Sequence, residues 1–248
     1  MPESNTTELP DSAQNRATRG ELAGRTVLIA GATSASGRAV AKALLAAGAR
    51  VVAVGSDQGR VDALESELPG VLGERADLTD GDDVLELAMR VHARVGDVDG
   101  VIHLVGGWRG GGGIAGQTEE DYRVLERSFT ALRSVSRAFW QDLVTSTAGR
   151  IAIVSSVTVE SPTAGSANYT AVKAASESWM RSLAHGFAPR PVDDVGALQP
   201  TEPGGGAAVI FRVRSLAGLE ERLAASVVEL WRADAAELNG SVTELTAD

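Results

Sequence analysis

Short runs rich in β-branched residues alternate with longer stretches of helical period along most of this chain, and that alternation limits the folds open to it. The runs that we expect to be strands are Thr26–Ala30, Arg50–Val54, Val71–Arg75, Gly100–Val105, Gly149–Val154, Ala207–Val213 and Ser241–Thr246. The stretches that we expect to be helices are Gly37–Ala47, Gln58–Glu67, Asp80–Val95, Thr118–Leu143, Ala167–Phe187 and Leu219–Ala236. A strand and a helix in turn form right-handed βαβ units. We therefore predict an α/β, doubly wound fold whose seven strands form one parallel sheet.

The chain of 248 residues is long enough for one large domain, and no feature marks a boundary between two. Residues 1–22 are polar and without period, which is typical of a disordered tail. The domain then spans residues 23–248. Residues 188–206 are rich in proline and glycine, so we expect one long loop before the sixth strand. Placing the sixth strand within residues 191–199 is an alternative, but these residues make a poor buried strand.

Composition excludes several kinds of function. The formal net charge of −10 argues against a general surface for nucleic acids or anionic membranes. The chain has no cysteine, which excludes disulfides and thiolate zinc sites, and His92, His103 and His185 lack metal-ligand spacing. No stretch is apolar for the length of a membrane span, and the N-terminus lacks the apolar segment of a signal peptide. We therefore expect a cytoplasmic protein without metal, nucleic-acid or membrane partners.

Three residues suited to carbonyl chemistry follow the fifth expected strand. Ser156 lies at its carboxyl end, and Tyr169 and Lys173 complete the pattern Ser-x12-Tyr-x3-Lys. Residues four apart share one face of a helix, and open α/β sheets bind ligands at the carboxyl ends of their strands. A phenol has a pKa of about 10, and a nearby ammonium lowers it. We expect Tyr169 to transfer a proton, Lys173 to lower its pKa, and Ser156 to bind the same substrate oxygen.

The first turn between an expected strand and an expected helix consists of small residues, GATSASG at positions 31–37. Small residues let the backbone approach a pyrophosphate, which the N–H groups and dipole of a helix N-terminus attract. Glycine also serves tight turns and close packing of a helix on a strand. The position of this turn, after the first strand of a βαβ series, favours dinucleotide binding.

Together these motifs resemble the short-chain dehydrogenase/reductase family, and the resemblance covers about residues 24–187. The family's first turn, Gly-x3-Gly-x-Gly, reads Gly31-x3-Ala35-x-Gly37, and its Ser, Tyr and Lys match without a gap. Its adenine-contacting aspartate matches Asp77, whereas only the glycine of its Asn-Asn-Ala-Gly motif survives in residues 103–106.

The resemblance implies a Rossmann-like fold and an NAD(P)-dependent oxidoreductase that interconverts a carbonyl and an alcohol by hydride transfer. In the family, the helices that carry Phe139, Trp140, Trp179 and Met180 often form the oligomer interface, which implies a homo-oligomer, dimer or tetramer. These four side chains are expected in the core or between subunits. The cofactor contacts that it implies are Gly31, Thr33, Ser34, Ser36, Gly37, Gly55, Ser56, Asp77, Leu78, Val105, Gly106, Tyr169 and Lys173.

Two departures from the family pattern bear on activity. Ser128 stands where the family has a catalytic asparagine that helps to hold a water in a proton relay, so Ser128 is the fourth expected catalytic residue, with the relay rebuilt or weakened. The family's Pro-Gly motif is missing after Ala207–Val213 and a helix follows almost at once, so we expect no substrate-binding lid there. The alternative function is therefore a cofactor-binding protein with little turnover that acts as a partner or regulatory subunit.

Cofactor choice depends on the end of the second strand. An acidic residue at the position of Gly55 would bind the ribose 2′-hydroxyl and repel a 2′-phosphate. Gly55 cannot repel the phosphate, Ser56 offers a hydrogen bond, and Arg60 is close in sequence, whereas Asp57 argues the other way. We expect NADP(H) to be favoured over NAD(H).

A glycine-rich run follows the fourth expected strand at residues 106–113. It is either a mobile flap beside the nicotinamide or a flexible loop without function. If it is a flap, Trp108 and Arg109 are the expected substrate contacts.

Overall fold

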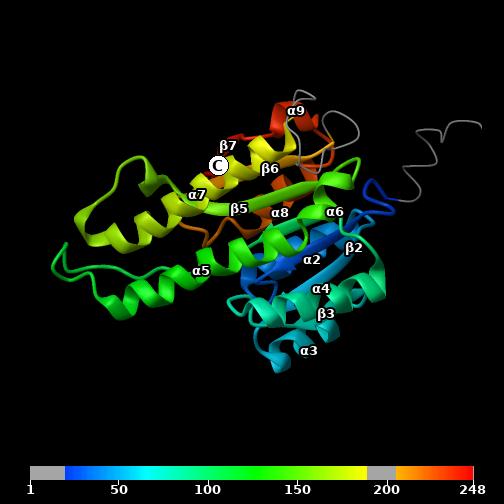
Figure 1. The fold of residues 1–248 in the computed structure, drawn as a ribbon, viewed down its shortest axis with the longest axis horizontal. Helices are drawn as coiled ribbons and strands as arrows, with labels where there is room; N and C mark the ends of the chain where they lie inside the picture. The colour runs from blue at the N-terminus through cyan, green and yellow to red at the C-terminus, as the bar shows by residue number, and fades with distance from the viewer. Residues whose placement is uncertain (1–19, 189–204, 248) are drawn as a thin grey trace, which may run out of the picture.

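The computed structural model describes residues 20–188 and 205–247, which form an α/β domain around a seven-stranded parallel sheet (Figure 1). The strands lie in the order β3-β2-β1-β4-β5-β6-β7. Because the order runs outward in both directions from β1 and β4, the sheet is doubly wound, and the predicted fold class is confirmed. The strands are β1 Thr26–Ala30, β2 Arg50–Gly55, β3 Val71–Arg75, β4 Gly100–His103, β5 Arg150–Ser156, β6 Ala207–Val213 and β7 Val242–Glu244.

Helices cover both faces of the sheet (Figure 1). They are α2 Ala35–Ala46, α3 Gln58–Glu67, α4 Gly81–Val95, α5 Glu119–Ala138, α6 Trp140–Thr145, α7 Ala167–Phe187, α8 Glu220–Glu229 and α9 Ala235–Leu238, with short 3-10 turns at Val157–Val159 and Ala164–Ser166. Successive strand side chains point to opposite faces. In β1, Val27 and Ile29 therefore pack with α2 and α8, whereas Leu28 and Ala30 pack with α4, α5 and α7. The central strand β1 is buried on both sides, which explains why it is apolar from Val27 onward.

Two of the expected helices are each divided in the structure. The stretch 118–143 breaks at Phe139, which leaves helical geometry (φ −105°, ψ 12°) and buries its ring completely, so that α6 starts again at Trp140. The stretch 219–236 ends as α8 at Glu229, and Asp234 then caps a separate helix, α9, by accepting a hydrogen bond from Ala236 N. Neither break involves proline or glycine, so the helical period of the sequence did not reveal it.

The sixth strand lies where the preferred interpretation placed it. Residues Ala207–Val213 pair in parallel with β5, from Arg150 opposite Ala207 to Ser156 opposite Val213. This register brings the residues after Val213 next to the carboxyl end of β5. The alternative strand at residues 191–199, and most of the expected loop at 188–206, lie outside the described residues.

The folded domain begins before residue 23. Leu22 is buried in the core, and its backbone N–H donates to Ala47 O at 2.8 Å. Residues 20–22, which the sequence assigned to the tail, therefore belong to the domain, while residues 1–19 lie outside the described part. Of the four large side chains expected in the core or between subunits, Phe139 and Met180 are fully buried, and Trp140 packs against Phe187. None of the helices within 20–188 and 205–247 combines the length and apolarity that crossing a bilayer requires.

Candidate active site

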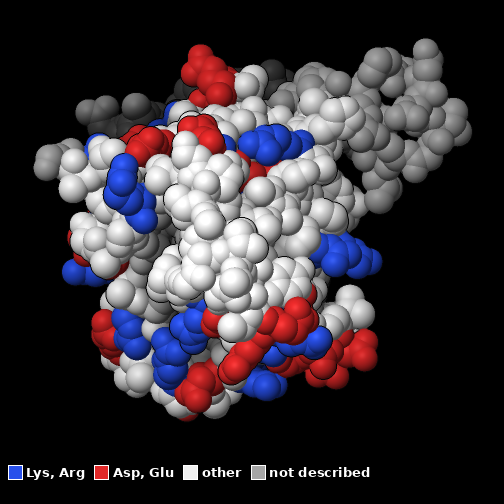
Figure 2. All heavy atoms as spheres, turned by 90° about the vertical axis from the view of Figure 1, so that its left-hand side faces the viewer, with Lys and Arg blue, Asp and Glu red and all other residues white. Residues whose placement is uncertain are grey.

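The carboxyl ends of β4, β5 and β6 and the start of α7 enclose a cavity of about 460 Å³. Ser156 is the last residue of β5, Tyr169 and Lys173 extend from α7, and all three line this cavity. Figure 2 looks onto this end of the molecule, where neutral side chains occupy the middle of the face and charged side chains gather above and below. The structure thus brings together the three residues that the spacing singled out.

Thr158 orients the hydroxyl of Ser156. Its backbone N–H and its Oγ1 both donate to Ser156 Oγ, at 3.2 and 3.0 Å. Thr158 Oγ1 in turn accepts a hydrogen bond of 3.1 Å from Thr170 on α7. Because Ser156 Oγ already accepts two bonds, its own hydrogen is available for another oxygen. Sequence reasoning missed Thr158, whose position two residues after Ser156 is the only signal that it gives.

The phenol of Tyr169 is half-buried beside Ser156. Burial raises the pKa of Tyr169, and a hydrogen bond with Ser156 opposes that rise. The Nζ atom of Lys173 lies 5.8 Å from the ring centroid, and burial outweighs the lowering of the phenol pKa that the sequence led us to expect. Tyr169 is therefore held in its protonated form, which is the form that donates.

Lys173 lies on the same face of α7, one turn after Tyr169. Its ammonium donates to Val154 O at 2.7 Å. Burial lowers the pKa of Lys173 to about 8, and the negative charge of Glu177, one further turn along α7, opposes that effect. At mildly basic pH, Lys173 is therefore a mixture of the charged ammonium and the neutral amine.

Glu177 is completely buried and ties α7 to two strands. Its carboxylate accepts from Ser155 Oγ at 2.7 Å, from Arg212 Nε and Nη2 at 2.8 and 2.7 Å, and from Arg181 Nη2 at 2.9 Å. These bonds hold the pKa of Glu177 below its usual value, against the effect of burial. Sequence reasoning missed this network, although Tyr169, Lys173 and Glu177 recur at intervals of four residues.

His103 and Ser128 form a contact beside this cavity. His103 is 4% exposed, and its Nε2 atom lies 3.1 Å from the backbone oxygen of Ser128. A carbonyl oxygen only accepts, so Nε2 carries the proton, and the buried Nδ1 has no partner among the described residues. Burial lowers the pKa of His103 to about 3, and the charge of Lys173 adds to the lowering.

A second cavity, of about 340 Å³, lies next to the first and shares Leu104, Val105 and Gly106 with it. Of the expected cofactor contacts, the second cavity is lined by Gly31, Thr33, Ser34, Gly55, Ser56, Asp77, Leu78, Val105 and Gly106. Tyr169 and Lys173 line the first cavity, and Ser36 and Gly37 lie buried in α2 without lining either. The two cavities meet at the end of β4, where a ligand extended along the strand ends would cross from one to the other.

The glycines of the first turn are needed for close approach. Gly31 has a φ of 85°, and a Cβ there would lie 3.0 Å from the carbonyl carbon of Leu104. A Cβ on Gly37 would lie 2.4 Å from Ala32 O, so only glycine lets α2 approach the turn. Ser34 caps α2, since its Oγ accepts from Gly37 N at 3.0 Å. The turn therefore leaves a side-chain-free cradle at a helix N-terminus, which suits an anionic phosphate.

The two residues at the end of β2 that line the second cavity, Gly55 and Ser56, carry no carboxylate. Asp57, the residue that argued against a 2′-phosphate, caps α3 by accepting from Arg60 N at 2.9 Å. Arg60 lines the cavity and donates from Nη2 to Thr33 O at 2.9 Å. The charged group nearest in sequence to Gly55 and Ser56 that lines this cavity is therefore a cation.

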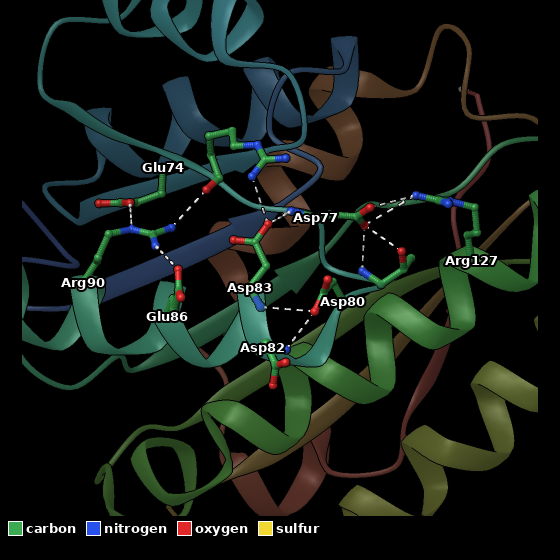
Figure 3. Close-up of polar contacts among 10 residues, drawn as sticks. Glu74, Asp77, Asp80, Asp82, Asp83, Glu86, Arg90 and Arg127 are labelled. Carbon is green, nitrogen blue, oxygen red and sulfur yellow. Dashed lines mark hydrogen bonds and ion pairs between the residues drawn. The ribbon is translucent and has the colours of Figure 1, made fainter.

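Asp77, at the end of β3, is joined to α5 (Figure 3). Its Oδ1 accepts from Thr79 N and Oγ1 at 2.9 and 2.6 Å, and its carboxylate pairs with Arg127 Nη2 at 3.2 Å. These interactions, those with Thr79 first, lower the pKa of Asp77. Arg127, which sequence reasoning missed, lies fifty residues away and joins Asp77 in the lining of the second cavity.

Comparison with known proteins identifies the family. Residues 25–202 match the model described as short chain dehydrogenase, which is more than half of the chain. The chain belongs to the short-chain dehydrogenase/reductase family. Nodulation protein G of Rhizobium meliloti (strain 1021) is 33% identical over 175 residues, 68% of this chain and 70% of that protein. The 3-oxoacyl-[acyl-carrier-protein] reductase FabG of Escherichia coli (strain K12) is 28% identical over 169 residues, 67% of this chain and 69% of that protein.

Solved structures agree in fold with this short-chain dehydrogenase/reductase. A crystal structure of a family member from Brucella melitensis has a TM-score of 0.74 at 18% identity and covers 92% of this chain and 97% of that one. Serine dehydrogenase from Escherichia coli has a TM-score of 0.74 at 20% identity and covers 89% and 96% of the two chains. Family members are oxidoreductases that bind NAD(P), and this chain is such an NAD(P)-dependent enzyme.

Ser128 occupies the position of the family's catalytic asparagine. Its backbone oxygen, and not its side chain, makes the contact with His103 beside the first cavity. Ser128 Oγ donates to Leu125 O within α5 at 2.7 Å, and Ser128 does not line the 460 Å³ cavity. Its carbonyl is the atom that His103 contacts. The expected catalytic hydroxyl is thus bonded within its own helix and does not line the cavity that Tyr169 lines, as is common for a serine in mid-helix.

The glycine-rich loop after β4 is tethered to Gly165 and to the first turn of α7. Gly111 N donates to Gly165 O at 2.7 Å, and the amide of Gln117 donates to Gly111 O, Gly113 O and Gly165 O at 3.0 to 3.2 Å. Gln117 Oε1 also accepts from Asn168 N at 3.0 Å, next to Tyr169.

The two residues expected as substrate contacts in this loop separate in the structure. Trp108 lines the first cavity, whereas Arg109 lies 3.7 Å from Asp121 and does not line it.

Proposed function

We propose that this chain interconverts a carbonyl and an alcohol, with Tyr169 as the proton donor or acceptor and NADP(H) as the preferred cofactor. The observation that carries the proposal is the joining of two cavities at the end of β4. One is lined by Ser156, Tyr169 and Lys173, and the other by the glycine turn and Asp77. The relative FabG is named as a 3-oxoacyl-[acyl-carrier-protein] reductase, and the reduction of an oxo group is a reaction of the same class.

The residues that line the cavities fit a dinucleotide. The cradle of Gly31 and Ser34 suits a pyrophosphate, and Asp77 and Leu78 lie where they would meet the adenine end. A Cβ on Gly106 would lie 3.6 Å from the Nζ atom of Lys173. Because glycine has no side chain, this side of the ammonium is left for the nicotinamide ribose. The nicotinamide supplies or accepts the hydride at the substrate carbon.

The side chains of β5 and α7 then move the proton. In the reducing direction, Tyr169 Oη gives its proton to the carbonyl oxygen as negative charge develops there. Ser156, held by Thr158, donates a hydrogen bond to the same oxygen. The ammonium of Lys173 stabilises the phenolate that remains, and Glu177 favours the charged form of Lys173. Oxidation of the alcohol uses the same groups in reverse.

The preference for NADP(H) follows from Gly55, Ser56 and Arg60. A 2′-phosphate in the second cavity would meet the Ser56 hydroxyl and the guanidinium of Arg60, both of which line it. Asp57 does not oppose this, because its carboxylate is used as the cap of α3. A guanidinium binds phosphate by charge-assisted hydrogen bonds.

One experiment tests the class of function. Titration calorimetry with NADPH and NADH measures binding, and NADPH consumption over a panel of ketones, aldehydes and oxo acids measures turnover. We expect NADPH to bind more tightly and at least one carbonyl class to be reduced.

The runner-up function, a cofactor-binding protein with little turnover, is favoured by the short connection at residues 214–219 between β6 and α8. Tight NADPH binding without turnover of any carbonyl or alcohol would establish it in place of the enzyme.

A further inference from the structure

The cavity beside Ser156 and Tyr169 is positively charged. Among the described residues that line it, none is acidic, and the cations are Lys173 and Arg214. His103 also lines it, but burial lowers the pKa of its imidazole to about 3 and keeps it neutral. The whole chain carries a formal charge of −10. The charge at the cavity is therefore opposite to that of the protein as a whole, which favours an anionic ligand there.

The two cations differ in what they already bind. Lys173 already donates to the backbone oxygen of Val154 and lies over the ring of Tyr169. Arg214 is exposed, and within residues 20–188 and 205–247 its guanidinium makes no hydrogen bond or ion pair. Its donors are consequently open to a ligand.

Arg212, two residues before Arg214, already binds the carboxylates near this end of β6. Two acidic side chains at this end of β6, Glu177 and Glu160, both bind Arg212. Both carboxylates therefore pair with Arg212, which is 9% exposed, and Arg181 pairs with Glu177 as well. The same contacts fix the end of the strand from which Arg214 extends.

The position of Arg214 relates it to the reacting oxygen. Val213 pairs with Ser156 across the β5–β6 ladder, and Arg214 follows directly. Adjacent strands lie about 4.8 Å apart, so Val213 lies about one strand spacing from Ser156, and Arg214 is one residue further along the chain. Trp108, Val213 and Leu216 supply apolar lining to the same cavity. The combination suits a carbonyl, a short apolar segment and an anionic group in one small molecule.

We propose that Arg214 binds the anionic group of the substrate, and that the enzyme therefore acts on oxo acids or phosphorylated carbonyl compounds. The proposal rests on the carbonyl chemistry assigned above to Tyr169. A planar guanidinium binds carboxylate and phosphate through paired hydrogen bonds, so both anions share the recognition chemistry.

The test compares matched charged and neutral substrates. The probes are pyruvate, acetoacetate and levulinate with their methyl esters, and dihydroxyacetone phosphate with dihydroxyacetone. We expect kcat/KM to favour the anion of at least one pair, with the carboxylate and phosphate arms showing which anion is used. In Arg214→Gln, that preference should fall by about 10- to 100-fold, the size expected for a hydrogen bond to a charged group. Arg214→Lys should retain part of it.

Two controls keep the result specific. Arg123→Gln removes one positive charge from the surface of α5, where Arg123 pairs with Glu119, and should leave the preference unchanged. The Kd of NADPH should be unchanged in Arg214→Gln. An equal weakening of NADPH binding would assign Arg214 to the cofactor phosphates and overturn the proposal.

Failure of this proposal and failure of the carbonyl chemistry give different results. Better turnover of the neutral partner in every pair would overturn the role of Arg214 while leaving Tyr169 in place. If no carbonyl is turned over, calorimetry with the protein saturated with NADP⁺ still decides. Binding of the anions that is lost in Arg214→Gln supports the anion site, and no binding overturns it.

Discussion

The carboxylate of Glu177 accepts two hydrogen bonds from the guanidinium of Arg212, at 2.8 and 2.7 Å, one turn of α7 beyond Lys173. Both groups are buried, and the pair joins α7 to β6 directly behind the catalytic face. Breaking such a pair leaves one buried charge without compensation. The pair therefore holds the two elements that position Lys173 and Arg214.

Replacing Glu177 by glutamine should destabilise the protein by up to about 3–5 kcal/mol, because the buried guanidinium of Arg212 loses its buried partner charge and keeps only the exposed carboxylate of Glu160. Urea unfolding of the wild type and Glu177→Gln measures this difference. The double variant Glu177→Leu with Arg212→Leu is the control, since it removes both charges and should recover much of the loss. A single variant as stable as the wild type would show that the pair does not hold α7 on β6.

The rate should fall as pH rises through about 8. Burial lowers the pKa of Lys173 to about 8, so the ammonium that stabilises the Tyr169 phenolate is lost above that pH. A profile of kcat/KM against pH, on any accepted carbonyl, should show this limb. In Glu177→Gln the limb should move to lower pH, because Glu177 favours the charged form of Lys173. A profile that stays flat from pH 7 to 9 would argue against this role of Lys173.

His103 should make the protein less stable in acid. Its pKa is about 3 in the folded state and about 6.5 when exposed, so between these values the unfolded chain binds the extra proton. Stability should therefore fall as pH drops from 6.5 towards 3, by up to about 1.4 kcal/mol per pH unit from this residue. Urea unfolding at several pH values measures the slope. His103→Asn, which does not titrate, should have a shallower slope, and an unchanged slope would contradict the assignment.

Arg60 should decide between the two cofactors. Arg60→Ala should weaken NADPH binding by about tenfold or more, through the loss of a charge-assisted contact, and leave NADH binding nearly unchanged. Calorimetry with both cofactors measures this, with Arg123→Ala as a surface control. Introducing an aspartate at Gly55 is a less clean test, because its Cβ would lie 2.8 Å from Thr33 Cγ2. Equal losses for NADPH and NADH would place Arg60 elsewhere on the cofactor.

Gln117 should hold the glycine-rich loop, whose Trp108 lines the first cavity, against the start of α7. Gln117→Ala removes the amide that bonds Gly111, Gly113, Gly165 and Asn168, so the loop should open more often and admit water. We expect kcat/KM to fall with little change in melting temperature. Gln141→Ala on α6 is a matched control away from this loop. Proteolysis of the loop that is no faster in Gln117→Ala would count against the tether.

Much of the fold and part of the site could be read from the sequence. The β-branched runs identified the seven strands of the described residues, including Ala207–Val213, because the central strands of a parallel sheet are buried on both faces and mostly apolar. Ser156, Tyr169 and Lys173 were found because their spacing alone places them together. Contacts that depend on strand order, such as Glu177 with Arg212 or Asp77 with Arg127, leave no local pattern. The break at Phe139 was missed because burial of one ring, and not a helix-breaking residue, sets it.

The most direct test of the proposed chemistry is turnover by Tyr169→Phe, measured together with NADPH binding. The variant loses only the phenol hydroxyl, which acts on the substrate oxygen. We predict turnover of the best carbonyl substrate at or near background, with a Kd for NADPH within about twofold of the wild type, which is under 0.5 kcal/mol of binding free energy. Wild-type turnover in Tyr169→Phe would show that another group transfers the proton and that the central assignment is wrong.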